Sequence, residues 1–428
     1  MNMNRNERLK AVVCGVNLKN HDDDFASDMQ ELKRLAEACE LEVVGEVTQS
    51  LDRVHPSHYI GLGKIQELTG LIEGTGADLV VFNDELTPSQ IRELEKQLDR
   101  RVMDRTMLIL DIFASRAKTR EAKLQVEMAQ LQYMLPRLAG RREHLSRQGG
   151  GAGLRNRGAG ETKLEMDRRK IEIKIAALTK ELDALAARRE VQRKKRQKNE
   201  IPVVSLVGYT NAGKSTIMNA MVEQFHPSPN KQVFEKDMLF ATLDTSVRKV
   251  KLPDNKTFLL TDTVGFVNKL PHHLVKAFRS TLEEAANADL LIHVVDFSDP
   301  RHPQLMEVTR QTLEEIGVRN VPVIVAFNKS DLADTEIPRV DGDAVYLSAK
   351  QRIGIRELAG LIASRIFKDY MQCELLIPYD QGRILAYLNE HGNVLSTEYE
   401  PDGTRIWVEC RHSDFEKYRD YVVAHESV

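Results

Sequence analysis

A glycine-rich stretch follows a short apolar run near the middle of the chain, and its residue types suit a polyphosphate. The run VVSLV leads into a loop that closes on Gly213, Lys214 and Ser215, and the helical pattern TIMNAMVEQ follows. Glycines let backbone N–H groups turn inward around phosphates, and the N-terminus of the helix adds its positive end. Lysine neutralises the β- and γ-phosphates, and a serine hydroxyl here ligates magnesium. The predicted phosphate-binding loop consists of Gly208, Tyr209, Thr210, Asn211, Ala212, Gly213, Lys214 and Ser215.

A second motif ends the apolar run TFLLT and consists of Asp262, Thr263, Val264 and Gly265. A carboxylate at this place holds Mg²⁺ through water, and the glycine amide binds the γ-phosphate. We therefore predict that Asp262, Thr263, Val264 and Gly265 bind the nucleotide, and that Asp262 also holds the metal through water.

Two further motifs predict the choice of base. A carboxylate at Asp331 accepts hydrogen bonds from N1–H and the 2-amino group of guanine, and adenine lacks this pair of donors. Asn328 is expected to tie its loop to the phosphate-binding loop, and the Lys329 stem to lie over the base. The predicted base-binding residues are Asn328, Lys329, Ser330, Asp331, Ser348, Ala349 and Lys350. All four motifs in this order, each after an apolar run, predict a guanine-nucleotide-binding GTPase.

The segment between the first two motifs has to supply a hydroxyl that closes over Mg²⁺ and the γ-phosphate. Thr242 is the first choice for this metal ligand and Thr245 is the alternative, because spacing alone does not separate them. The nucleotide-contacting stretch predicted here is Phe240, Ala241, Thr242, Leu243 and Asp244.

Two positions bear on how GTP is hydrolysed. Phe266 follows Gly265, where many GTPases carry a glutamine that orients the attacking water. Phenylalanine neither donates nor accepts a hydrogen bond, so this chain must position the water otherwise. The carbonyl of Asn211 suits a monovalent cation such as K⁺ against the phosphates, and we predict potassium-stimulated hydrolysis. The alternative is an ordinary amide that stabilises the loop.

Charge is unevenly distributed along the 428 residues. The whole chain carries a net charge of −3, yet residues 141–198 contain 18 Lys and Arg against 8 Asp and Glu. Such a basic segment on an acidic body is typical of contact with a polyanion; the alternative is a solvated helix face. The polar N-terminus, the lack of a membrane-length apolar run and four cysteines without metal-ligand spacing predict a cytosolic protein with no membrane span.

Patterning divides the chain into four parts and predicts an α/β protein. Alternating strand and helix signals indicate a small α/β domain at 1–103. Heptad spacing in two segments, Leu124 to Leu138 and Ile171 to Leu185, indicates an antiparallel helical hairpin within 104–198. Pro136 should kink or end the first helix early. A P-loop GTPase domain at 199–370 and a small α+β domain at 371–428, ending in the helix DFEKYRDYVV, complete the chain.

A glycine-rich loop with Arg155 and Arg157 separates the two hairpin helices. It is either a flexible linker or a tip that contacts phosphates or base edges. This loop and the stretches YIGLGKIQEL, DELTPSQ, DRTMLILDIFASRAKTREAKLQVEMAQLQYMLPRL, GYTNAGKST, LFATLDT and DTVGFV resemble the HflX family of translational GTPases over nearly the whole chain.

The resemblance implies a protein that binds the large ribosomal subunit and splits stalled or idle ribosomes, with GTP and GDP governing the association. It implies that residues around Arg155 and Arg157 approach ribosomal RNA, that Ser215 and Thr242 ligate Mg²⁺, and that the free protein is a monomer. Two alternatives stay open, a large-subunit assembly factor with GTP as a checkpoint and a phosphotransferase. The stretch AMVEQFHPSPNKQVFEKDM departs from the family pattern, which bears on the geometry of the loop that holds Thr242.

Overall fold

The computed structural model describes residues 8–18, 25–139, 157–198, 201–225, 246–269 and 285–426, with the side chains of its longest helix described from 165 to 191. The chain forms two compact units, each assembled from segments that are separate in the sequence. Unit 1 comprises Met1–Lys194, Lys236–Asp244 and Val264–Leu282, and unit 2 comprises Lys195–Glu235, Thr245–Thr263 and Glu283–Val428. No helix within the described ranges is long and apolar enough to cross a membrane.

Unit 1 begins with a four-stranded sheet in the order β2-β1-β3-β4, in which all neighbours are parallel. The elements are β1 (Lys10–Leu18), α1 (Phe25–Ala38), β2 (Glu42–Leu51), α2 (Leu62–Thr75), β3 (Leu79–Phe82), α3 (Pro88–Leu98) and β4 (Arg101–Asp104). The small parallel α/β domain predicted from the alternating patterns is therefore present. Thr87 caps α3, because its hydroxyl accepts from the backbone N–H of Gln90.

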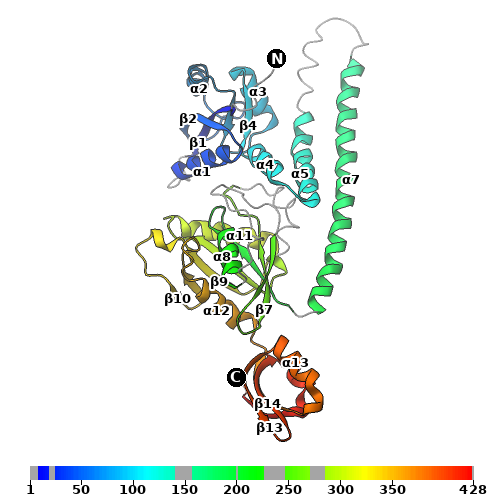
Figure 1. The fold of residues 1–428 in the computed structure, drawn as a ribbon. Coiled ribbons are helices and arrows are strands. Elements are labelled where there is room, and N and C mark those ends of the chain that lie inside the picture. The colour runs from blue at the N-terminus through cyan, green and yellow to red at the C-terminus, as the bar shows by residue number, and fades with distance from the viewer. Residues whose placement is uncertain are drawn as a thin grey trace. The chain divides into compact units, whose positions relative to one another are not determined.

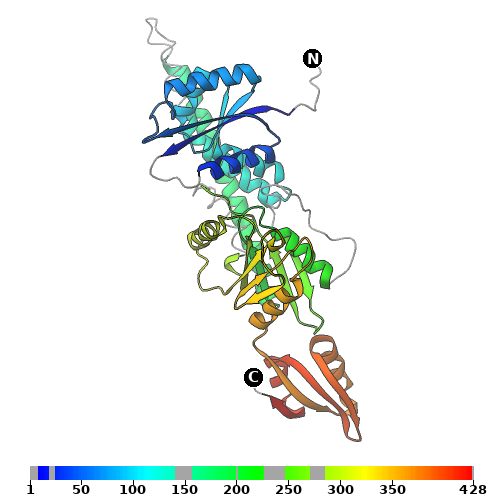
Figure 2. The same cartoon turned by 90° about the vertical axis from the view of Figure 1, so that its left-hand side faces the viewer.

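Successive residues of β1 supply two separate cores. Ala11 and Val13 pack in one cluster with α1, whereas Val12 and Cys14 pack in another with α2 and α3. Side chains alternate between the two faces of a strand, so a run of consecutive apolar residues buries both faces. The result is a three-layer arrangement with helices on each side of the sheet (Figure 2).

The predicted antiparallel hairpin consists of two helices that lie side by side (Figure 1). After α4 (Arg105–Arg116) come α5 (Arg120–Ala139) and α7 (Arg157–Lys198). Lys174 pairs with Glu127, and Arg189 pairs with Glu121 at 2.9 Å, so later residues of α7 meet earlier residues of α5. Leu178, a member of the predicted apolar row, is buried, while its neighbours in sequence are exposed.

Helix α5 has a second apolar face that its heptad pattern does not reveal. Ala122, Val126, Ala129 and Tyr133 are buried in the N-terminal core, in contact with the sheet side that also packs against α1. The small alanines in this row permit close packing but give a weak sequence signal. The helix is therefore shared between the hairpin and the N-terminal domain.

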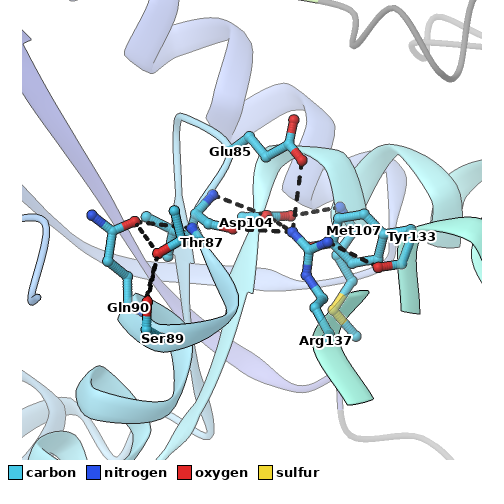
Figure 3. Close-up of polar contacts among 9 residues, drawn as sticks. Glu85, Thr87, Ser89, Gln90, Asp104, Met107, Tyr133 and Arg137 are labelled. Carbon is cyan, nitrogen blue, oxygen red and sulfur yellow. Dashed lines mark hydrogen bonds and ion pairs between the residues drawn. The ribbon is translucent and has the colours of Figure 1, made fainter. Parts of the chain in front are cut away.

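Of the two effects predicted for Pro136, a kink or an early end of its helix, the early end is wrong, because α5 continues to Ala139. Contacts of Arg137 hold the last turn (Figure 3). Its guanidinium lies 3.3 Å from the centroid of the Tyr133 ring and donates to the Leu86 carbonyl at 3.0 Å and to the buried Asp104 carboxylate at 3.2 Å. Charge-assisted bonds to a buried carboxylate are strong enough to offset the backbone hydrogen bond that proline removes.

Unit 2 contains a seven-stranded sheet in the order β10-β11-β9-β8-β5-β7-β6. Its elements are β5 (Val203–Val207), α8 (Lys214–Phe225), β6 (Ser246–Lys251), β7 (Thr257–Asp262), β8 (Leu290–Asp296), α11 (His302–Glu315), β9 (Val323–Asn328), the 3₁₀ turn η1 (Ser330–Leu332), β10 (Arg339–Asp341), β11 (Ala344–Tyr346) and α12 (Ile355–Ile366). The five inner strands are parallel, and the two edge strands, β10 and β6, are antiparallel to their neighbours. Helices α8 and α12 share one apolar core with the sheet.

A second, four-stranded sheet with the order β13-β14-β12-β15 closes unit 2. Its elements are β12 (Tyr370–Ile377), η2 (Tyr379–Gln381), α13 (Gly382–His391), β13 (Asn393–Glu400), β14 (Gly403–Arg411), α14 (His412–Lys417), η3 (Arg419–Tyr421) and β15 (Val422–Glu426). The helix predicted for DFEKYRDYVV ends at Lys417 instead, and the chain adds a strand antiparallel to β12. The β-branched Val422 and Val423 favour this pairing over continued helix.

Candidate functional site

Four loops leave the large sheet of unit 2 at the same edge. They follow β5, β7, β9 and β11, which run parallel to one another, so their carboxyl ends are neighbours. Ligands of open α/β sheets bind outside the carboxyl ends of the strands. The sheet thus brings together four motifs that lie up to 140 residues apart in the sequence.

Two glycines of the loop after β5 are required by its backbone. Gly208 has φ 145°, and a Cβ there would lie 2.2 Å from the carbonyl oxygen of Val294. Gly213 has φ 95°, and a Cβ there would lie 2.1 Å from Nδ2 of Asn328. Asn211 adopts φ 62°, a left-handed conformation that asparagine tolerates. These values describe a tight loop pressed against two neighbouring strands.

Lys214 begins α8 and is buried under the loop that precedes it. Its Nζ donates to the carbonyls of Gly208 at 3.0 Å and Tyr209 at 2.8 Å. Burial lowers the pKa of Lys214 to about 8, although the Asp262 carboxylate acts in the opposite direction. On the adjacent strand β8, burial and the nearby Lys214 lower the pKa of His293 to about 4, so this imidazole is neutral at pH 7.

Ser215 and Asp262 bring two side-chain oxygen atoms together beside the phosphate-binding loop. The Ser215 hydroxyl donates to Oδ2 of the fully buried Asp262 at 2.6 Å, and the next residue, Thr263, donates to the Leu206 carbonyl at 2.6 Å. A hydroxyl and a carboxylate are ligands suited to Mg²⁺, which in phosphate sites takes few protein ligands and completes its shell with phosphates and water. In the described ranges, no three His, Cys, Asp or Glu side chains gather into a metal site of their own.

Asn328 joins three of the four loops. Its Nδ2 donates to the Ala212 carbonyl at 2.9 Å, and its Oδ1 accepts from the Ala349 backbone N–H at 2.9 Å. Both bonds are buried, and Asn328 itself is 3% exposed. The expected tie between Asn328 and the phosphate-binding loop is therefore confirmed.

Asp331 and Lys329 each have a neighbour that the sequence did not reveal. Oδ2 of Asp331 accepts from Gln351 Nε2 at 3.1 Å, and Lys329 pairs with Asp296 at 2.7 Å. Asp296 ends β8 at the same sheet edge, and Gln351 directly follows the Ser348–Lys350 motif. Their places next to predicted motifs were the only sequence signal that could have indicated them. Ser348 and Ser330 are buried, whereas Lys350 is exposed.

The remaining predicted residues either belong to unit 1 or are outside the described ranges. Val264 and Gly265 belong to unit 1, and Val264 is buried in the N-terminal core. The predicted stretch Phe240 to Asp244, with Thr242, lies outside the described residues, as do the alternative Thr245 and the loop residue Arg155. Arg157 begins α7, but its side chain is outside the described range.

The fold and the four loops define a P-loop GTPase domain within an α/β protein. Three family models match consecutive parts of the chain. They describe a GTP-binding GTPase N-terminal region at 26–114, a GTP-binding GTPase middle region at 116–196 and a 50S ribosome-binding GTPase at 203–329.

Curated relatives specify the family. The GTPase HflX of Caldanaerobacter subterraneus subsp. tengcongensis is 43% identical over 98% of this chain and 95% of its own length. The GTPase HflX of Escherichia coli K12 is 40% identical over 89% of each chain. The chain therefore belongs to the HflX family of GTPases and is a GTP hydrolase. Among solved structures, a GTP-binding protein from Sulfolobus solfataricus in complex with GDP is 22% identical, covering 84% of this chain and 99% of its own, with a TM-score of 0.44.

Proposed function

We propose that this GTPase binds the large ribosomal subunit in the cytosol and splits or rescues stalled or idle ribosomes, with GTP binding and hydrolysis controlling the association. The observation that carries the proposal is the match of residues 203–329 to a model described as a 50S ribosome-binding GTPase. The curated HflX relatives align with nearly the whole chain, including the helical hairpin.

The distribution of charge in the hairpin supports an RNA partner. Within α7, residues 165–191 carry seven Lys and Arg against six Asp and Glu, and several of these charges are paired, as in Arg168–Glu172 and Lys170–Asp167. The basic excess lies beyond this stretch, with five basic residues and one acidic residue at 141–157 and five basic residues at 193–198. A stretch with this excess of basic residues between two helices suits contact with phosphates.

For the nucleotide, we propose the following roles. The amides of residues 208–213 and the Lys214 ammonium bind the phosphates, Asp331 selects guanine, and the loops at Asn328 and Ser348 hold the base. Ser215, Thr242 and, through water, Asp262 hold Mg²⁺, which neutralises charge that develops on the phosphates. Lys214 supplies a further positive charge from a buried position, where electrostatic stabilisation is stronger than in water.

Light scattering of intact ribosomes tests splitting. Adding the pure full-length protein with GTP to intact ribosomes should reduce the scattered intensity, because separated subunits have a lower mass. Adding it with GDP should have little effect. Cosedimentation with isolated 50S subunits measures binding in parallel. Binding without any decrease in scattering would favour the alternative, a large-subunit assembly factor that uses GTP as a checkpoint.

The RNA contact can be tested by charge removal at two places in the same hairpin. The double variant Arg155→Ala, Arg157→Ala should weaken binding to 50S subunits and lower the slope of log affinity against log salt by about 1 for each phosphate that is no longer neutralised. The matched control, Arg168→Ala with Lys170→Ala, removes the same charge from ion-paired positions of α7. An equal decrease of affinity in both variants would contradict a specific interaction at Arg155 and Arg157.

We further propose that Asn211 ligates K⁺ and that K⁺ stimulates hydrolysis. Asn211 lies on the phosphate-binding loop with a left-handed backbone, φ 62°. Phe266 leaves the usual place of a water-orienting glutamine without a polar side chain. Turnover should be several-fold faster in KCl than in NaCl at equal ionic strength. Asn211→Ala should abolish the difference, and equal wild-type turnover in both salts would remove the proposal.

A further inference from the structure

The segment that follows the Asp262–Gly265 motif belongs to unit 1, although the strand that leads to it belongs to unit 2. The chain changes unit between Thr263 and Val264, inside the motif itself. Val264 and Val267 are 6% and 2% exposed and pack in the same cluster as Val13 and Leu32 of the N-terminal domain. Two apolar side chains thus fix residues 264–267 within the N-terminal core.

The Arg105 side chain binds the backbone of the same segment. It is 2% exposed, forms an ion pair with the buried Glu31, and donates to Asn83 Oδ1 at 2.9 Å and to the Asn268 carbonyl at 3.0 Å. A guanidinium with a fixed fork of donors holds such a group of acceptors in one geometry. The bond to Asn268 spans 163 residues of sequence.

Lys269, which belongs to the segment, forms a second attachment to the N-terminal domain. Its Nζ lies 3.0 Å from Asp28 and 3.0 Å from Asp84, and Asn268 Nδ2 donates to Asp28 at 3.1 Å. Burial alone would lower the pKa of Lys269, but the two carboxylates outweigh it and raise the pKa above the ordinary value. Lys269 is therefore a cation held between α1 and the loop that follows β3 in the N-terminal domain.

These contacts act at a place that matters for hydrolysis. In GTPases the residues after the DxxG motif take one arrangement when the γ-phosphate is present and another after it leaves. Phe266 has no polar group that could orient the attacking water. The backbone of residues 264–269 must therefore contribute more to the position of this water. Displacement of a reacting group by about 1 Å costs up to 10²-fold in rate.

We propose that Arg105 and Lys269 are positioning residues for GTP hydrolysis, which fix residues 264–269 to the N-terminal domain and thereby set the course of the chain beyond Asp262. Both residues act by holding the backbone of this segment in place, and neither acts by touching the nucleotide. Replacing them lowers the rate of the chemical step and leaves affinity for GDP nearly unchanged, because the loops at 208–215, 328–331 and 348–350 lie in unit 2.

Single-turnover hydrolysis by the full-length protein, with protein in excess over GTP and with Mg²⁺, tests the proposal without ribosomes. Lys269→Gln should lower the rate about tenfold, with the Kd for fluorescently labelled GDP within about twofold of wild type by the same reasoning. Lys269→Arg keeps the cation and should restore most of the rate. Arg105→Lys keeps the charge but not the fork, and it should also slow the chemical step.

The matched control is Lys33→Gln, since Lys33 pairs with Glu46 in the same domain and its side chain is 39% exposed against 40% for Lys269. This variant should hydrolyse GTP at the wild-type rate. Lys269→Gln with Asp28→Asn should slow hydrolysis less than the product of the single effects, because the two residues form one ion pair. A faster rate in Lys269→Gln, an unchanged rate, or a decrease matched by Lys33→Gln would each overturn the proposal. None of these outcomes depends on whether the protein splits ribosomes.

Discussion

The Asp331→Asn variant is expected to lose most of its affinity for GTP and to gain affinity for xanthosine triphosphate. In the proposed role, the carboxylate would accept two hydrogen bonds from guanine, each worth about 1.5–3 kcal/mol as a bond to a charged group. An amide presents one donor to the 2-amino group, so a repulsive contact replaces one of the bonds. We expect GTP affinity to fall roughly 10²- to 10³-fold. Xanthine carries a carbonyl at this position, and the asparagine Nδ2 donates to it.

Competition of GTP, XTP and ATP against a fluorescent guanine nucleotide measures the change. Asp334→Asn is the control, because it makes the same substitution three residues away at an exposed position. Asp331 accepts from Gln351, so Gln351→Ala should change GTP affinity far less than Asp331→Asn. A variant at Asp331 that still prefers GTP to XTP would show that another residue selects the base.

The nucleotide loops were predictable because their chemistry dictates residue type and spacing. Phosphate binding requires glycines and a lysine at fixed offsets, and each loop follows a strand that reads as an apolar run. The contact of Asn328 with the phosphate-binding loop was predicted from the motif at 328–331, and the structure explains it by the parallel strands β5 and β9 on either side of β8. Local patterns of this kind also predicted the N-terminal sheet and the antiparallel α5–α7 pair.

Features that depend on distant partners were not predictable in the same way. Nothing in the sequence around Arg105 or Asn268 indicates that these two residues form a hydrogen bond. In the sequence, Arg105 at the start of α4 resembles an ordinary exposed arginine. The second face of α5 is built from alanines, which any helix favours. Strand β15 replaces the end of a predicted helix because pairing with β12 decides its conformation, and its two valines alone do not specify that partner.

The position of the unit boundary links these two groups of features. Asp262 and Thr263 are held in unit 2 by Ser215 and Leu206, whereas Asn268 and Lys269 are held in unit 1 by Arg105, Asp28 and Asp84. Few residues therefore separate a predicted magnesium ligand from a buried ion-pair network of the N-terminal domain. Any movement of the motif on nucleotide exchange must be absorbed by the short stretch between them, or transmitted to that network.

Gly213→Ala is the substitution from which we expect the largest loss of nucleotide binding for the smallest chemical change. The new methyl group would meet Asn328 Nδ2 at 2.1 Å, and alanine is strained at φ 95°. Asn328 would have to leave its position and give up its bonds to Ala212 and Ala349. Because one change disrupts three loops, we expect GTP and GDP affinity to fall by at least about 100-fold.

Gly360→Ala is the matched control, because Gly360 lies in α12 of the same unit and a Cβ there meets nothing within 4 Å. It should bind nucleotide normally and gain about 0.5–1 kcal/mol in free energy of unfolding, since alanine favours helix. The double variant Gly213→Ala, Asn328→Ala separates the two costs of the first change. If the collision with Asn328 dominates, the double variant binds GDP no worse than Asn328→Ala alone. If backbone strain dominates, it binds clearly worse, and wild-type affinity in Gly213→Ala itself would contradict both explanations.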